Sequence, residues 1–182
     1  MKGSLELLLA YHCSPALLGI KSANLINCSI KEYPNIEEEL DKLNKQYNPR
    51  ICFKVLSKKN NKLLVLVYQP KRLEKTLFNK ANNKYLLNKG YLPSNNINDY
   101  INTLANNINN LDDFPHEIGV FLNYSLDDVI NYENGISKCK YVGYWKIYSN
   151  VEEKLKIFNS YTRCRNKIVS LLNKGYSLQA II

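Results

Sequence analysis

The chain has 182 residues, 45% of them hydrophobic, and a formal net charge of +9. This length suits a single domain spanning 1–182, which can bury a core without disulfide bonds. The five cysteines are odd in number and contain no CxxC pair, which excludes a standard zinc or iron–sulfur spacing. The apolar stretch Met1–Ala10 lacks a cleavage site and is too short to span a bilayer. We therefore expect no membrane segment, a cytoplasmic location and free thiols.

Three helices are predicted in the N-terminal part of the chain. Ser4 is a suitable cap for the first helix. Ser14 followed by Pro15 favours a second helix that starts at Pro15 and continues to Ile26, because Pro is favoured at the first helical position. Asn35 and Glu38 have the spacing of a capping box, which predicts the start of the third helix.

A β-hairpin is predicted next. Segments 51–56 and 63–68 are rich in β-forming residues, and Asn60-Asn61 between them suits a tight turn. Another strand is predicted at 141–148, and apolar residues recur at helical spacing in segments 71–89, 97–110 and 151–174. The expected fold class is α+β, with a small, mostly antiparallel sheet (hairpin 51–68 plus strand 141–148) covered by helices.

The positive charge is concentrated in one segment of the chain. Between Lys54 and Lys89 there are ten basic residues and one acid, Glu74. A basic face of this kind could meet an acidic partner or phosphates. Lys outnumbers Arg heavily, however, and Arg is the better phosphate ligand, so nucleic-acid binding is not favoured.

Three separated segments carry a resemblance to a known family. They are His12–Lys21, which begins HCSP, Phe114–Gly119, which is FPHEIG, and Gly143–Tyr148, which is GYWKIY. Together they resemble the bacterial family called domain of unknown function 3793, common in anaerobic Firmicutes, along essentially the whole chain. The resemblance implies no established activity. The family usually has Gly at the position of Asn123 and Pro at that of Ser125; Asn tolerates the left-handed conformation that such a Gly often adopts.

A thiol-dependent site is the first functional hypothesis. Cys13 is expected just before a helix start, where unpaired N–H groups and the helix dipole stabilise a thiolate. His116 precedes an apolar run, as the histidine of many thiol hydrolases does. We therefore consider Cys13, His116 and Glu117 candidate catalytic residues of a hydrolase or transferase. Further candidates for ligand binding are His12, Lys21, Trp145 and Lys146. We expect Cys13, His116 and Trp145 to lie in one pocket.

Two other hypotheses compete with this one. The segment 116–133 fits a helix-turn-helix pattern, although its second helix would carry Asp127, Asp128 and Glu133 and would repel phosphates. A strand at 116–122, which Val120 and Phe121 favour, would support the hydrolase analogy. A helix there, which the start Pro115-His116 favours and which we expect, would support the helix-turn-helix pattern instead. A metal- or haem-binding protein is the third hypothesis, since the chain has the ligand types His12, Cys13, His116, Glu117 and Cys164. No Gly-rich phosphate loop, HExxH or GxSxG is present, which argues against nucleotide binding and serine hydrolysis; the cofactor, if any, is unknown from the sequence.

Overall fold

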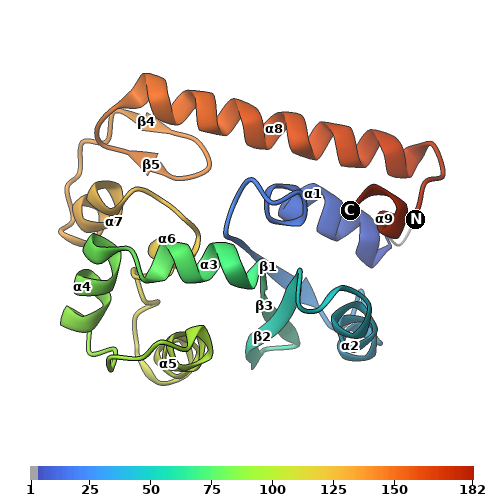
Figure 1. The fold of residues 1–182 in the computed structure, drawn as a ribbon, viewed down its shortest axis with the longest axis horizontal. Helices are drawn as coiled ribbons and strands as arrows, with labels where there is room; N and C mark the ends of the chain where they lie inside the picture. Colours follow the sequence, from blue (N-terminus) through green and yellow to red (C-terminus); the bar gives the residue numbers. More distant parts are fainter. Residues whose placement is uncertain (1–3) are drawn as a thin grey trace.

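The structure is a computed structural model and describes residues 4–182 (Figure 1). It has the α+β architecture expected from the sequence. In chain order the elements of the described residues are α1 (Leu5–Leu17), β1 (Ala23–Ser29), α2 (Ile36–Tyr47), β2 (Cys52–Lys59), β3 (Lys62–Tyr68), α3 (Pro70–Leu77), α4 (Lys80–Asn88), α5 (Ile97–Asn110), α6 (Ile118–Phe121), α7 (Leu126–Glu133), β4 (Tyr141–Val142), β5 (Lys146–Ile147), α8 (Val151–Asn173) and α9 (Leu178–Ile181).

The main sheet is antiparallel and has the strand order β1-β3-β2. Strands β2 and β3 form the predicted hairpin, and its turn residues Asn60 and Asn61 both have positive φ, at 52° and 57°. Asn tolerates this left-handed backbone conformation better than most residues do, which explains why an Asn pair forms the turn. The central strand β3 pairs with a neighbour on each side, and it is the most deeply buried of the three.

Helices cover both faces of this sheet and create two hydrophobic clusters. Alternate residues of β3 point to opposite faces, as the pleat requires. Leu63, Val65 and Val67 belong to a cluster formed with α1, α2, α8 and α9. Leu66 and Tyr68 belong to the other cluster, formed with α3, α4, α5, α6 and α7. A third, smaller cluster joins the β4–β5 hairpin to α8 and consists of Trp145, Ile147, Phe158 and Tyr161.

The predicted second helix starting at Pro15 is wrong. Helix α1 continues through Pro15 to Leu17, and residues 23–29 form the edge strand β1. The hydroxyl of Ser14 donates to the carbonyl of Ala10 inside α1 and does not cap a new helix. The helix ends where Gly19 adopts a φ of 71°, and the side chain of Asn24 on β1 then accepts a hydrogen bond from the N–H of Ala16 at 3.1 Å. Most of the apolar residues of 23–29 are buried because β1 pairs with β3. No local sequence signal reveals this pairing.

The predicted strand 141–148 is also different in the structure. It forms a separate two-stranded hairpin, β4–β5, which does not pair with the main sheet. Its turn lies at Gly143–Trp145, and a Cβ at Gly143 would come within 2.3 Å of the ring of Phe158. Close packing of this turn on α8 therefore requires glycine, and it breaks the strand at its centre.

The predicted helix in the segment 116–122 is confirmed by α6. Asn123 follows it with a φ of 57°, and α7 begins three residues later at Leu126. Gly119 lies where the two helices cross, because a Cβ there would be 2.7 Å from Cγ2 of Val129. The backbone thus has the two-helix form that the sequence pattern favours.

We expect Gly119→Ala to lower the free energy of unfolding by about 1–3 kcal/mol, the usual effect of overpacking a tight contact. The added methyl group would clash with the side chain of Val129, so the effect should shrink in a Val129→Ala background. Urea denaturation of the two single variants and the double variant would measure this coupling. Simple additivity of the two effects would contradict the proposed contact.

Candidate functional site

An aromatic groove is the clearest candidate site in the described part of the chain. It has a volume of about 380 Å³ and opens where α6, α7 and the β4–β5 hairpin meet. Two of the three motif segments, FPHEIG and GYWKIY, contribute to its walls. The aromatic residues that line it are Phe114, Tyr124, Tyr132, Tyr144 and Trp145, and the polar side chains are those of His116, Asp128 and Lys146. Sites for small organic molecules usually combine mainly apolar walls with a few polar groups.

The floor of the groove is a stack of rings. The ring of Trp145 stacks on that of Tyr124, with 4.6 Å between centroids and 22° between planes. On its other side Trp145 meets Phe158 of α8 edge-to-face, at 4.5 Å and 84°. Trp145 is thus held between α8 and the turn after α6, and such ring pairs stabilise a fixed geometry.

The polar groups at the mouth come from His116 and Lys146. The ring of His116 lies edge-to-face against Tyr132, at 5.2 Å, and Nζ of Lys146 lies 5.0 Å from the centroid of the same ring. Both side chains are exposed. Among the described residues no carboxylate lies within ion-pair distance of Lys146. The mouth of the groove therefore presents one unpaired positive charge and an imidazole.

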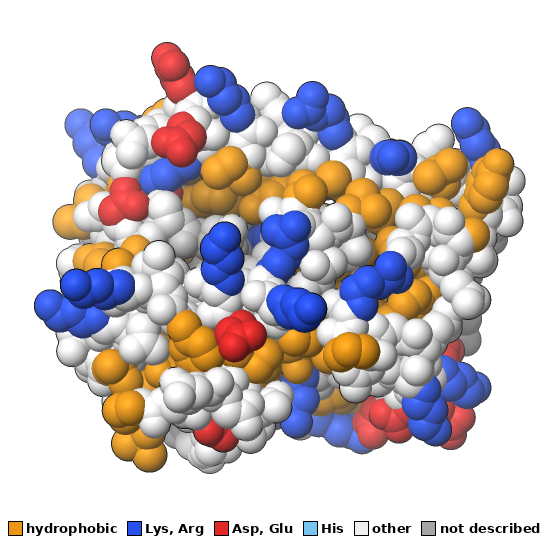
Figure 2. Space-filling view, in the orientation of Figure 1, with side chains coloured by type: hydrophobic (Ala, Val, Ile, Leu, Met, Phe, Trp, Pro, Cys, Tyr) orange, Lys and Arg blue, Asp and Glu red, His pale blue; other side chains and the backbone are white. Residues whose placement is uncertain are grey.

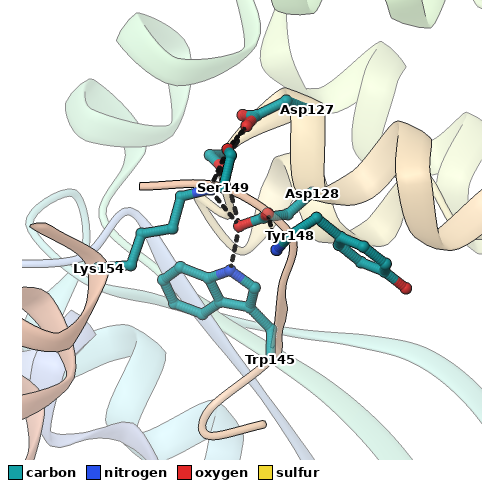
Figure 3. Close-up of polar contacts among 7 residues, drawn as sticks. Asp127, Asp128, Trp145, Tyr148, Ser149 and Lys154 are labelled. Carbon is teal, nitrogen blue, oxygen red and sulfur yellow. Dashed lines mark hydrogen bonds and ion pairs between the residues drawn. The ribbon is translucent and has the colours of Figure 1, made fainter. Parts of the chain in front are cut away.

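A buried polar network anchors the groove from behind (Figure 3). The carboxylate of Asp128 is 2% exposed and forms an ion pair with Nζ of Lys154 at 2.7 Å. It also accepts hydrogen bonds at 2.8 Å from the indole N–H of Trp145, the backbone N–H of Tyr148 and the hydroxyl of Ser125. Burial raises the pKa of Asp128, but the hydrogen bonds from Lys154, Tyr148, Trp145 and Ser125 outweigh it, so the pKa is lowered. Asp128 thus remains ionised and ties the hairpin to α7 and α8.

Cys13 does not lie where the sequence analysis expects it. It belongs to the body of α1, which begins at Leu5, so the predicted stabilisation of its thiolate by a helix start is wrong. Its side chain is 0% exposed and sits in the core beside Cys28. Burial, followed by the nearby Cys28, raises the pKa of the Cys13 thiol far above its usual range, and the nearby Lys21 only partly offsets this. A buried, protonated thiol is a poor nucleophile.

The structure brings together only some of the predicted site residues. His116, Trp145 and Lys146 line the groove, whereas Cys13 and Glu117 do not. The buried carboxylate of Glu117 accepts hydrogen bonds from the amide of Asn107 at 2.9 Å and from the hydroxyl of Tyr91 at 3.3 Å. The contact with Asn107 fixes the start of α6 to α5, so Glu117 helps to hold the fold together. A catalytic role for Cys13, His116 and Glu117 stays a prediction.

Neither His12 nor Lys21 lines the groove. His12 is an exposed residue of α1 whose pKa is lowered by partial burial and by the nearby Arg165. Lys21 is 3% exposed, and its Nζ lies 5.2 Å from the ring centroid of Tyr124 and 5.4 Å from that of Tyr161. Burial lowers the pKa of Lys21 to about 8, although the neighbouring Cys13 counteracts this. Lys21 therefore supports the groove wall from inside.

A comparison with family models shows what the chain is related to. The model described as "Protein of unknown function (DUF3793)" matches residues 9–182. The chain belongs to this family. The match confirms the resemblance that the three motifs indicate. No curated protein and no solved structure matches the chain.

Nothing in the described fold of this DUF3793 chain favours nucleic-acid or metal binding over the other hypotheses. The two-helix geometry is present, but α7 carries Asp127, Asp128 and Glu133 and no basic residue that could contact a phosphate. Over residues 4–182, no three His, Cys, Asp or Glu side chains are grouped so that they could hold a metal ion. In the same range no helix has the length and apolar character needed to cross a membrane.

The basic segment of this DUF3793 chain is exposed but partly neutralised. All ten Lys and Arg side chains between 54 and 89 are exposed. Lys58 forms an ion pair with Glu37 and Lys89 forms one with Glu133, while Lys59 donates to the carbonyl of Asn109 at 2.9 Å. Figure 2 shows Lys and Arg side chains gathered over α3, below a band of hydrophobic side chains that follows the lower edge of α8. Most of the Lys and Arg side chains without such partners therefore lie on α3 and α4.

Sequence reasoning missed the Asp128–Lys154 pair and most of the aromatic wall. It treated Asp127 and Asp128 as surface charges of a recognition helix. One local signal was available, because Ser125 and Asp128 have the spacing of a capping box, and their side chains do form a 2.8 Å hydrogen bond. Nothing in the local sequence marks Lys154 as the partner of Asp128.

Proposed function

We propose that this protein binds a small planar aromatic acid in the aromatic groove. The observation that carries the proposal is the combination of a ring-lined cavity with the unpaired ammonium of Lys146 at its mouth. The faces of Tyr124, Tyr132 and Trp145 favour a flat, unsaturated ligand, because aromatic rings prefer offset-stacked or edge-to-face neighbours. The volume of about 380 Å³ lies in the range of small-molecule sites.

The charges around the groove favour an anion over a cation. Lys146 and His116 offer hydrogen-bond donors at the mouth, and Lys21 adds positive charge behind Tyr124. Asp128, the one carboxylate among the lining residues, is saturated by four donors and lies at the back. A cationic ligand would therefore find no available carboxylate. An anionic ligand would meet Lys146, which can form a charge-assisted hydrogen bond.

Binding is better supported than thiol chemistry. The Cys13 thiol is buried in a different hydrophobic cluster from that of Trp145. No cysteine is among the residues that line the groove. His116 is the one imidazole among the lining residues. The groove thus holds a recognition surface without a nucleophile of the predicted kind.

The single tryptophan of the chain provides a direct test. Because Trp145 lines the groove, its indole N–H signal in a ¹H–¹⁵N spectrum should shift when 2-naphthoate is added, and the shift should saturate. The neutral isostere 2-naphthamide should bind at least about tenfold more weakly, since one charge-assisted hydrogen bond contributes about 1.5–3 kcal/mol. Lys146→Met should weaken naphthoate binding by a similar factor and leave naphthamide binding unchanged.

Lys140→Met is the matched control, because Lys140 is an exposed residue of the same hairpin region that does not line the groove. Its affinity for naphthoate should equal that of the unmodified protein. The proposal fails if the indole signal does not respond to millimolar naphthoate. It fails equally if Lys140→Met and Lys146→Met weaken binding to the same extent.

A further inference from the structure

A second pocket lies on the other side of the β4–β5 turn, against α8. It has a volume of about 310 Å³ and shares Gly143 and Tyr144 with the aromatic groove. Three polar residues of α8 line it in succession, Asn159, Thr162 and Arg165. They are spaced three apart along the helix, so they lie on one face and point toward the same space.

Arg165 is held in place without a charged partner. Its guanidinium carbon lies over the ring of Tyr11 on α1, 4.9 Å from the centroid, a cation–π contact that restrains the group. Within residues 4–182 no carboxylate lies within ion-pair distance of Arg165, and the guanidinium donates to no side chain or carbonyl there. A restrained guanidinium with free N–H groups is a preformed donor for a planar or tetrahedral oxyanion.

The surroundings of Arg165 supply neutral donors and further positive charge. The hydroxyl of Thr162 lies 3.1 Å from that of Tyr144, which orients both groups at the pocket wall. Tyr144 meets Tyr161 edge-to-face at 5.5 Å, and the buried ammonium of Lys21 lies on the ring of Tyr161. Asp127 and Asp128 on the neighbouring α7 are both paired with Lys154. Arg165 is the one charged side chain among the residues that line this pocket, so the lining carries a net positive charge.

We infer that this pocket is an oxyanion site, in which Arg165 forms two hydrogen bonds to a phosphate or carboxylate group and Thr162 and Asn159 each add one more. The site is distinct from the aromatic groove, and an oxyanion can bind there while the groove is empty. Its chemistry is that of an oxyanion carried by a small molecule, and both phosphate and carboxylate groups satisfy it.

Inorganic phosphate and acetate, titrated separately at constant ionic strength, test the inference. The Nε–H signal of Arg165 and the backbone amide signals of Thr162 and Tyr144 should shift and saturate with at least one of the two anions. The anion that binds more tightly identifies the source of the oxyanion. Arg165→Gln should weaken binding by about tenfold or more, because a bidentate charge-assisted contact is lost.

Arg163→Gln is the matched control, since Arg163 lies on the same helix, is exposed and does not line the pocket. It removes the same net charge and should leave the affinity unchanged. Thr162→Val, which keeps the shape of the side chain, should weaken binding by a smaller factor and guards against a folding defect in Arg165→Gln. Linear, unsaturated shifts in the unmodified protein, or equal losses in the two arginine variants, would overturn the inference. Lys146→Met should have no effect on either anion, so this result is independent of the aromatic groove.

Discussion

Asp128→Asn is expected to lower the free energy of unfolding by about 3–5 kcal/mol, the usual effect of removing one partner of a buried ion pair. The substitution keeps the shape of the side chain but leaves the ammonium of Lys154, which is 5% exposed, without its close counterion. It also turns an amide N–H₂ toward groups that are themselves donors, including the indole N–H of Trp145. Urea denaturation, followed by the fluorescence of Trp145, would measure the loss.

Two further variants separate the buried pair from general surface charge. Asp127→Asn is the matched control, because the side chain of Asp127 is 50% exposed and its contact with Lys154 is longer, at 3.4 Å. Its effect should be below about 1 kcal/mol, as for other exposed pairs. Adding Lys154→Met to Asp128→Asn should restore much of the lost stability, since the uncompensated buried charge is gone. Equal losses in the two aspartate variants would show that Asp128 has no special role.

Lys21→Met is expected to stabilise the protein at pH 7, by about 2–3 kcal/mol. Burial lowers the pKa of Lys21 from 10.5 to about 8, and each unit of such a difference corresponds to about 1.4 kcal/mol. Since Lys21 is 3% exposed, little solvent is present to screen this effect. Methionine fills a similar space between Tyr124 and Tyr161 and requires no desolvation of a charge.

The advantage of Lys21→Met should depend on pH in a defined direction. Between about pH 8 and 10.5 the unfolded chain holds a proton on Lys21 that the folded chain has lost, so this group makes the unmodified protein more stable as the pH rises. The difference between the two proteins should therefore be full below pH 8 and shrink to nearly zero by pH 10.5. Stability curves of both proteins across this range would show it. Comparison of the two removes the opposite trend of the buried thiol of Cys28, whose raised pKa is common to both.

Lys75→Met provides the reference for that experiment, because Lys75 is an exposed lysine of α3. It should change stability by no more than about 0.5 kcal/mol at any pH in the range. A destabilised Lys21→Met, or a difference that is the same at pH 7 and pH 10, would contradict the assignment of Lys21 as a desolvated charge.

Local sequence signals predicted the elements whose causes are local. The hairpin 51–68 follows from two β-rich runs around Asn60-Asn61, and the helices at 97–110 and 151–173 follow from apolar spacing. The signal of Ser14-Pro15 was misleading, because the same two residues fit inside α1 when Ser14 bonds back to Ala10. What decides between the two outcomes is the pairing of 23–29 with β3, a contact between residues about forty apart.

The candidate site was predictable only where its residues are close together in the sequence. The segments FPHEIG and GYWKIY stand out in the sequence, and both line the groove. Their assembly depends on the ion pair of Asp128 with Lys154, two residues on different helices. The burial of Cys13 depends on how α1 lies between the sheet and α8, which the spacing of cysteines does not reveal. The catalytic role proposed for Cys13 from its residue type was therefore unreliable, because tertiary packing decides whether its side chain is exposed.

The third hydrophobic cluster has a consequence for the dynamics of the molecule. The strands β4 and β5 have two residues each, too few to be stable alone, and they are held by Trp145 and Ile147 on α8 and by the carboxylate of Asp128. The hairpin can thus open as a cooperative unit while the main sheet stays intact. Each opening would dissolve both pockets at once, since Gly143 and Tyr144 belong to both. A ligand in either pocket would slow hydrogen exchange across the hairpin and thereby stabilise the other pocket, which couples two separate sites through one local unfolding equilibrium.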